Sequence, residues 1–537
     1  MEEGSKVNNT EGDATGEDIE TMVSQPAEHE VEEQKEENGD GGGGGGGGEG
    51  VAGDVETLVV RKLSVLDVLH VMAYGGFVVK ECLAVLTLSR ASWIDTRLWA
   101  PLLNVRYKKE LGGRKVEETR LMRECREGTE AAVQRLLGLK TDVNAANTLG
   151  VTALVLACQV GRIALVHMLI AAGANVDLVA NGFSALNMAS INGHAAVVHA
   201  LIAAGANVDH ANKTATSSII MASEKGHEAV VQALIAAGAN VNHARNDGAS
   251  SLIMATMKGH EAVVHALIAA GANVDHATNN GASSLIMASQ NGHLTTVQAL
   301  IAAGANVSKQ VNTNVASALN IASQNGHIAV VQALIAAGAS VDYANNTGTS
   351  SLIVASQNGH EAVVHALIAA GANVNHVKAD GGSSLTRASQ KGHEAVVQSL
   401  LLAGANVNHA RNDGASSLIM ASMDGHEAVV HALIAAGANV DHANNNGASS
   451  LIMASQNGHL TTVQALIAAG ANVMYVANDG ATALDRARGG NHAKVVAALE
   501  DRIAARLTTL RDLADESDDD DFSDCVDAYL ASLVKDV

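Results

Sequence analysis

The segment Leu267-Ile-Ala-Ala-Gly-Ala-Asn-Val274 decides the fold of this 537-residue chain, because it returns at a nearly constant period. Successive copies of its glycine are 33 residues apart, except for one interval of 32 and one of 34. The glycines of this segment and its close variants are Gly173, Gly205, Gly238, Gly271, Gly304, Gly338, Gly371, Gly404, Gly437 and Gly470. Self-similarity at this period predicts a stack of small units in which each unit contacts only its neighbours.

Residues 281–313 show the pattern of one unit. Gly281 permits a tight turn, and Ser283 is placed to cap the N-terminus of a first helix. Gly292 stops that helix and His293 opens a second one, which Gly304 ends as a left-handed cap. The pattern predicts two short antiparallel helices and a protruding turn per repeat, and therefore an all-α solenoid.

These motifs resemble those of the ankyrin repeat family. A turn glycine, a Gly-His pair between the helices (Gly425-His426) and Gly-Ala-x-Val after them recur over residues 117–502, in about twelve units that include divergent capping repeats. The family's Thr-Pro-Leu-His helix start is replaced by Ser-Ser-Leu-Ile, as at 250–253 and 416–419. The loss of proline and histidine weakens the expectation of hydrogen bonds between neighbouring helix starts, and predicts an array softer than a consensus one.

Acidic tails flank the predicted array. Residues 1–55 end in a run of eight glycines and carry a net charge of −14, and residues 512–537 carry −9 of the chain's −22. Residues 1–55 are therefore expected to be a disordered acidic and glycine-rich tail, and residues 503–537 a terminal helix followed by an acidic tail. The body between the tails is close to neutral, which argues against binding of nucleic acid.

Residues 56–116 differ from the repeats and are expected to form a small helical module. Within 59–104, the stretch Leu83–Arg90 and the Leu98-Trp99 pair resemble the back half of an F-box, although a Leu-Pro start is missing. This resemblance implies docking onto the adaptor of a ubiquitin ligase, and with it the alternative function of the substrate-recruiting subunit of that ligase. The alternative is an ordinary helical cap. Basic residues from Arg106 to Lys115 are read as a solvated face rather than a nuclear signal.

The composition points away from catalysis and metal binding. The 23 histidines fall mostly into three phased sets, and stacked repeats would place neighbouring copies too far apart to share one zinc ion. Each Ser, His or Asp in the array has copies one repeat away, whereas a catalytic site is normally unique. We therefore expect no enzyme activity, cofactor or metal, and the four scattered cysteines favour a reducing compartment. We expect the chain to be a monomer in the cytoplasm or nucleus. We expect no membrane-spanning segment.

The informative positions are those at which otherwise copied units differ. Residues 244–307 and 410–473 are identical at all but three of 64 positions, namely Thr256/Ser422, Lys258/Asp424 and Thr278/Asn444. In the family, turn tips and first helices form a concave face that binds a protein partner, and the differing residues lie in these elements. The alternative interpretation is that loop residues vary by drift, without any role in binding. The candidate partner-binding residues are Lys213, Glu224, Lys225, Arg245, Met257, Lys258, Gln290, Asn291, Gln357, Lys378, Lys391, Arg411, Met423, Asp424 and Asn445.

Overall fold

A computed structural model describes residues 106–111, 114–308 and 316–515 of the chain. By their contacts the residues form two compact units, which are described separately here. Of the residues that the structure describes, the first unit comprises 106–111, 114–222 and 232–239, and the second comprises 223–231, 240–308 and 316–515. Helices α12 and α13 contribute residues to both units.

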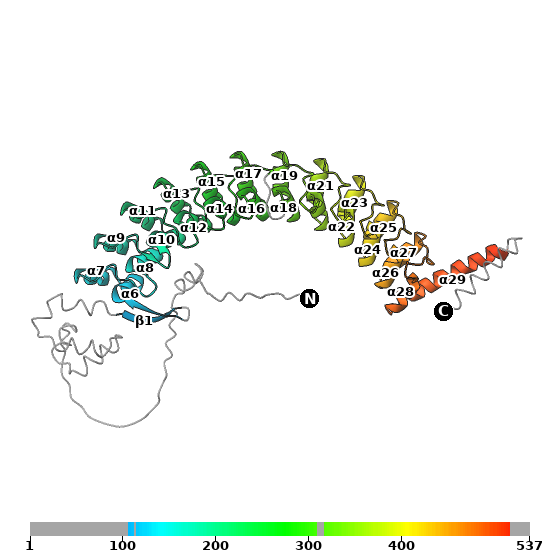
Figure 1. Ribbon diagram of the computed structural model, residues 1–537, viewed down its shortest axis with the longest axis horizontal. Coiled ribbons are helices and arrows are strands. Elements are labelled where there is room, and N and C mark those ends of the chain that lie inside the picture. The colour runs from blue at the N-terminus through cyan, green and yellow to red at the C-terminus, as the bar shows by residue number, and fades with distance from the viewer. Residues whose placement is uncertain (1–105, 112–113, 309–315, 516–537) are drawn as a thin grey trace, which may run out of the picture. The chain divides into compact units, whose positions relative to one another are not determined.

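The first unit contains two short antiparallel sheets and the first pairs of helices (Figure 1). Its strands are β1 (Arg106–Leu111), β2 (Arg114–Thr119), β3 (Val179–Ala180) and β4 (Phe183–Ser184). Its helices, including the two shared ones, are α6 (Arg120–Glu127), α7 (Glu130–Gly138), α8 (Ala153–Val160), α9 (Ile163–Ala171), α10 (Ala185–Ile191), α11 (Ala195–Ala203), α12 (Ser218–Lys225) and α13 (Glu228–Ala236). Cys125 and Cys158 are free thiols buried in α6 and α8.

The second unit is a stack of helix pairs. Its helices are α14 (Ser251–Lys258), α15 (Glu261–Ala269), α16 (Ser284–Asn291), α17 (Leu294–Ala302), α18 (Ala318–Gln324), α19 (Ile328–Ala336), α20 (Ser351–Gln357), α21 (Glu361–Ala369), α22 (Ser384–Lys391), α23 (Glu394–Leu402), α24 (Ser417–Asp424), α25 (Glu427–Ala435), α26 (Ser450–Gln456), α27 (Leu460–Ala468), α28 (Ala483–Gly489) and α29 (Ala493–Asp515). Each even-numbered helix opens a repeat, and from α14 to α28 each packs against the next even-numbered helix, while the odd-numbered helices form a second row (Figure 1). The all-α solenoid predicted from the period is confirmed.

Capping explains the length of each helix. In the repeat that contains α14, the Ser250 hydroxyl accepts a hydrogen bond from the N–H of Ile253, which satisfies one free donor at the helix start. Gly259 ends the helix in the left-handed region at φ 75°, and Gly271 does the same after α15 at φ 82°. The chain therefore turns at glycines every half repeat.

The core consists of small and branched aliphatic side chains. In the same repeat Leu252 and Ile253 of α14 and Val263, Val264 and Leu267 of α15 are at most 2% exposed. Each helix is too short to bury its apolar face alone, so neighbouring repeats complete its core.

Two expectations about local structure need correction. Ser283 occupies the N-cap position of α16, but its hydroxyl makes no capping hydrogen bond. The predicted helical module 56–116 is wrong at its C-terminal end, because residues 106–111 and 114–119 pair as an antiparallel hairpin. The sequence between these strands is Gly112-Gly113, a favoured hairpin connection whose signal was overlooked. The F-box-like stretch 59–104 and the tail 1–55 lie outside the described residues.

Helix starts differ between repeats in a way that bears on stability. The Asn320 amide in α18 donates to the hydroxyl of Ser351 in α20, at 2.9 Å. In α20 the residue equivalent to Asn320 is Ile353, and the hydroxyl of Ser384 in α22 is buried without a hydrogen-bond partner among the described residues. Such unpaired buried hydroxyls are unfavourable, which supports the prediction of a soft array.

Candidate protein interface

Histidines of the loops connect successive repeats. The Nε2 atom of His409 lies 2.7 Å from the carbonyl oxygen of Gly381, and that of His442 lies 2.8 Å from the oxygen of Gly414. Because a carbonyl oxygen only accepts, Nε2 carries the proton and donates in each case. These histidines hold the turn of the preceding repeat in place.

The histidines of the Gly-His pairs form a second row of contacts. The Nε2 of His426 donates to the Gln390 carbonyl oxygen of the preceding repeat at 3.0 Å, and His459 bonds likewise to Met423. The ring of His459 also covers Gly425, where a Cβ atom would lie 2.4 Å from its Nδ1. Gly425 is therefore required both by its φ of 75° and by the neighbouring histidine.

Asparagines add two further rows. At the turn tips the Asn445 side-chain amide donates to the Asn412 carbonyl oxygen at 3.0 Å, and its main-chain N–H donates to that of Asp413. At the ends of first helices the Asn291 amide donates to the carbonyl oxygens of Met257 and Met287. We call all these contacts between repeats, made by the recurring histidines, asparagines and glycines, the seam.

Two residues of the predicted partner-binding set also take part in the seam. Asn445 and Asn291 are exposed, but their amide donors bond to backbone carbonyls. Asn325, Asn358 and Asn457 make the same kind of bond at the position of Asn291, and Asn279, Asn412 and Asn478 do so at the position of Asn445. Both side chains therefore join neighbouring repeats.

Most other candidates lie on one face of their unit. We define the first-helix face of the second unit as the turn tips together with the solvent-facing side of the even-numbered helices α14–α28, away from the odd-numbered helices. Exposed on it are the charged candidates Lys258, Lys391 and Asp424 and the amide Gln290. The half-buried candidates are Arg245, Met257, Gln357, Lys378, Arg411 and Met423. Glu224 is half-buried at the end of α12, where Lys225 is exposed, and Lys213 is exposed in the turn that precedes α12.

Ion pairs at the turn tips limit the freedom of two candidates and add two residues that sequence reasoning missed. Arg245 pairs with Asp247 at 3.3 Å and Arg411 with Asp413 at 3.4 Å, each within its own turn. One guanidinium nitrogen of Arg411 also lies 3.9 Å from the Met420 sulfur, so the side chain covers this methionine. The missed residues are Arg387 and Arg486, which replace methionine in α22 and α28 and pair with aspartates of their turns.

Asp380, the partner of Arg387, is held in its charged form. Partial burial raises the pKa of the Asp380 carboxyl, but the Gly382 N–H and the Arg387 guanidinium outweigh it, so the pKa falls below its usual value. A charged pair at this position therefore persists at neutral pH. Several other repeats have methionine at the position of Arg387 and Arg486, for example Met420. The two arginines interrupt this recurrence, and the interruption is the signal in the sequence that could have identified them.

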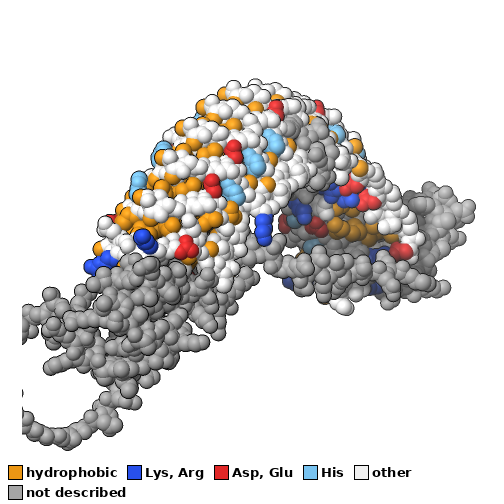
Figure 2. All heavy atoms as spheres, turned by 60° about the vertical axis from the view of Figure 1, so that its left-hand side comes forward, with side chains coloured by type: hydrophobic (Ala, Val, Ile, Leu, Met, Phe, Trp, Pro, Cys, Tyr) orange, Lys and Arg blue, Asp and Glu red, His pale blue; other side chains and the backbone are white. Residues whose placement is uncertain are grey.

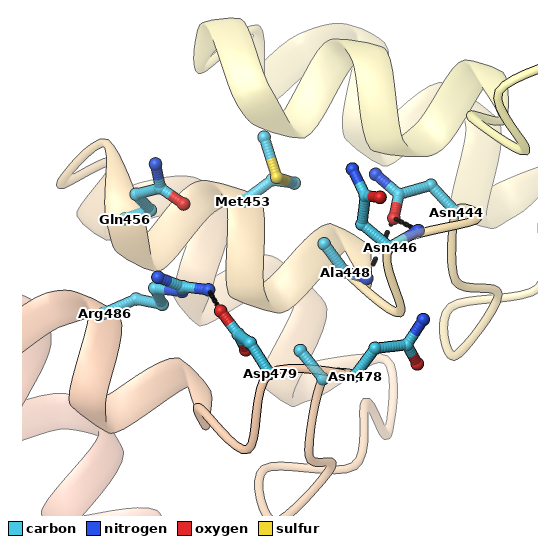
Figure 3. Close-up of a pocket in the computed structure, with 9 residues that line it drawn as sticks. Asn444, Asn446, Ala448, Met453, Gln456, Asn478, Asp479 and Arg486 are labelled. Atoms are coloured by element: carbon cyan, nitrogen blue, oxygen red, sulfur yellow. Dashed lines mark hydrogen bonds and ion pairs between the residues drawn. The ribbon is translucent and has the colours of Figure 1, made fainter.

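A hollow of about 540 Å³ opens on the first-helix face between the last two repeats (Figure 3). It is lined by Asn444, Asn446, Ala448, Met453, Gln456, Ala477, Asn478, Asp479 and Arg486. Residue 444 corresponds to Arg411 in the preceding repeat, where the long side chain lies over Met420. The shorter Asn444 leaves the equivalent Met453 open to the hollow. The lining of the hollow therefore combines apolar side chains with amides and one ion pair.

Charged side chains are sparse on the face of the molecule that Figure 2 shows, where they lie singly or in small groups among hydrophobic and uncharged ones. Within the described residues, no group of three or more His, Cys, Asp or Glu side chains is placed to hold a metal ion. None of the described helices has the length and apolar character needed to cross a lipid bilayer.

Comparison with protein families agrees with the fold. A family model described as ankyrin repeats (3 copies) matches residues 121–212, 219–311, 309–378, 385–477 and 418–506. The chain therefore belongs to the ankyrin repeat family, whose members generally act through protein–protein interactions. Comparison with curated proteins found no similar sequence.

Proposed function

We propose that this chain is a non-enzymatic scaffold that binds a protein partner through its first-helix face and turn tips, the concave side that the family resemblance implies. One observation carries the proposal. At the position before the Gly-His pair, Asn291 bonds to the Met257 carbonyl oxygen of the preceding repeat, whereas Lys258 and Asp424, which hold this position in two near-identical repeats, are exposed. Variation at an exposed position where the fold tolerates loss of that bond is typical of recognition.

The chemistry of the first-helix face suits a partner held by several modest contacts. Met257 and Met423 offer adaptable apolar surface, and Gln290 and Gln357 offer amides for hydrogen bonds. Aromatic residues, which often dominate binding energy, make up only 2% of the chain. We infer that affinity accumulates over several repeats.

The buried free thiols support a location inside the cell. Burial raises the pKa of the Cys125 thiol to about 12, and Cys158 is also buried, so neither side chain serves as a reactive thiolate. Free cysteines in a folded core are typical of a reducing compartment. We propose that the chain acts there as a monomer.

Cross-linking mass spectrometry of the full chain in cell extract tests the proposed function. An amine-reactive cross-linker samples Lys258, Lys378 and Lys391 on the first-helix face and Lys494 at the start of α29. We expect partner cross-links at the first three lysines and few at Lys494. Partner cross-links found only at Lys494 or in the tails would contradict the proposal.

A further inference from the structure

The second unit displays nearly the same surface twice. In the repeat of α14, Ala249, Ile253 and Met254 are 5%, 2% and 5% exposed. The equivalent residues in the repeat of α24 have the same three values. The two copies therefore match in side-chain packing as well as in sequence, and any ligand chemistry that suits one suits the other wherever their residues agree.

Each copy presents two partly open methionines. In the second copy Met423 and Met453 are half-buried and pack against the cluster of Ala415, Ile419 and Met420. Met257 and Met287 hold the equivalent positions in the first copy and are also half-buried. We call these two patches the first methionine patch (Met257, Met287) and the second methionine patch (Met423, Met453).

The second methionine patch has room for a further side chain. Met453 lines the hollow of about 540 Å³ together with Asp479 and Arg486, which form an ion pair (Figure 3). The chain itself shows how a methionine at this position is covered, because the Arg411 side chain lies over Met420 one repeat earlier. At the equivalent place of the next repeat the shorter Asn444 stands instead of an arginine, and Met453 lines the hollow.

Charge beside the two patches is reversed. Lys258 ends α14 directly after Met257, and Asp424 ends α24 directly after Met423. Both side chains are exposed and make no ion pair among the described residues. Lys391 occupies the same position in α22 as Asp424 does in α24, and the two helices pack against each other. The positive charge of Lys391 therefore partly offsets the negative potential of Asp424. Since charges are sparse on this array, a reversal at one position changes the local potential.

We infer that the two methionine patches are paired anchoring sites for apolar side chains of a protein partner. The first patch selects an acidic residue beside the apolar one through Lys258, and the second selects a basic residue through Asp424. The inference rests on the proposed function and names the chemistry of the partner at two places. A partner that engages both patches therefore carries two apolar anchors with opposite neighbouring charges.

Selection from a library of random 12-residue peptides displayed on phage, with the full chain as bait, tests the inference. The variants are K258D, D424K, the double variant M257S/M287S and the double variant M423S/M453S. We expect M423S/M453S to lower recovery of apolar peptides rich in Lys and Arg about tenfold, since each lost methionine contact removes apolar burial. M257S/M287S should do the same for apolar peptides rich in Asp and Glu.

The charge variants give a smaller and directional effect. D424K should lower the ratio of basic to acidic peptides about two- to fivefold, and K258D should raise it by a similar factor, as expected for one exposed charge pair. Circular dichroism of all variants should match the parent chain, because none of the four methionines is fully buried and both charges are exposed.

Two results would overturn the inference. One is a set of recovered peptides whose composition is the same for the parent chain and all four variants. The other is recovery of no apolar peptide by the parent chain. In both cases partner cross-links at Lys258, Lys378 and Lys391 in cell extract would leave the proposed function standing, whereas their absence would remove it as well.

Discussion

The seam and the first-helix face of the second unit are built from the same repeats and yet differ in how much they vary. At the seam, His426 and His459 make the same bond one repeat apart, and Asn412 and Asn445 do likewise. On the first-helix face, Lys258 is replaced by Asp424 in an otherwise nearly identical copy. The comparison separates residues that join neighbouring repeats from exposed residues that make no such bond.

The largest effect is expected at a seam glycine. Gly425→Ala forces a left-handed φ on alanine and places its Cβ 2.4 Å from His459 Nδ1, so we expect a loss of about 2–4 kcal/mol. The matched control is Gly437→Ala, which has a similar φ of 84° but no atom within 4 Å of the new Cβ. The control should lose only about 1 kcal/mol.

Urea denaturation followed by circular dichroism, together with hydrogen exchange of α25 and α26, measures both glycine variants. Equal losses for Gly425→Ala and Gly437→Ala would show that the contact with His459 contributes nothing. The seam would then depend on backbone conformation alone.

A second test compares two equivalent serines. Ser351→Ala removes the acceptor of the Asn320 amide and should destabilise the array by about 1 kcal/mol. Ser384→Ala removes a buried hydroxyl that has no partner among the described residues, so it should leave stability unchanged or raise it by up to about 1 kcal/mol. Because both changes put alanine at the same place in a helix, helix propensity cancels in the comparison. Effects of the same sign and size in urea denaturation would refute this account of the helix starts.

A smaller gain is expected in the turn before α12. Ala215 adopts a left-handed φ of 59° at the position where other repeats have glycine. Ala215→Gly should therefore stabilise the turn by about 0.5–1 kcal/mol. The substitution relieves backbone strain in the folded state, and the greater entropy that glycine gives the unfolded chain offsets part of this gain. A rise in the thermal midpoint is the expected readout, and a fall would show that other contacts of Ala215 matter more.

The smallest effect belongs to the first-helix face. Lys258→Asp and Asp424→Lys should each change the free energy of unfolding by less than about 0.5 kcal/mol, because these exposed side chains take no part in the seam. The thermal midpoints of the parent chain and both variants provide the check. A loss comparable with that of Gly425→Ala would mean that these positions are structural after all.

Much of this architecture could be predicted from the sequence because each repeat states the same pattern. The period placed the helices, and Gly292 and Gly304 marked helix ends correctly. Sequence variation alone could not show that Asn291 and Asn445 take part in the seam. Their role depends on the backbone carbonyl oxygen to which each side-chain amide donates, and only the structure shows these bonds. Recurrence of asparagine at those positions was the available sign. The hairpin β1–β2 was missed because the basic stretch was read as the end of a helical module.

Hydrogen–deuterium exchange of the full chain, with and without the partner recovered by cross-linking, tests the central claim most directly. We predict slower exchange on binding in the turn tips 245–248 and 411–414 and in the first helices α14 and α24. The second helices α15 and α25 should exchange as before. Protection confined to α15 and α25, with the turn tips unchanged, would contradict the account.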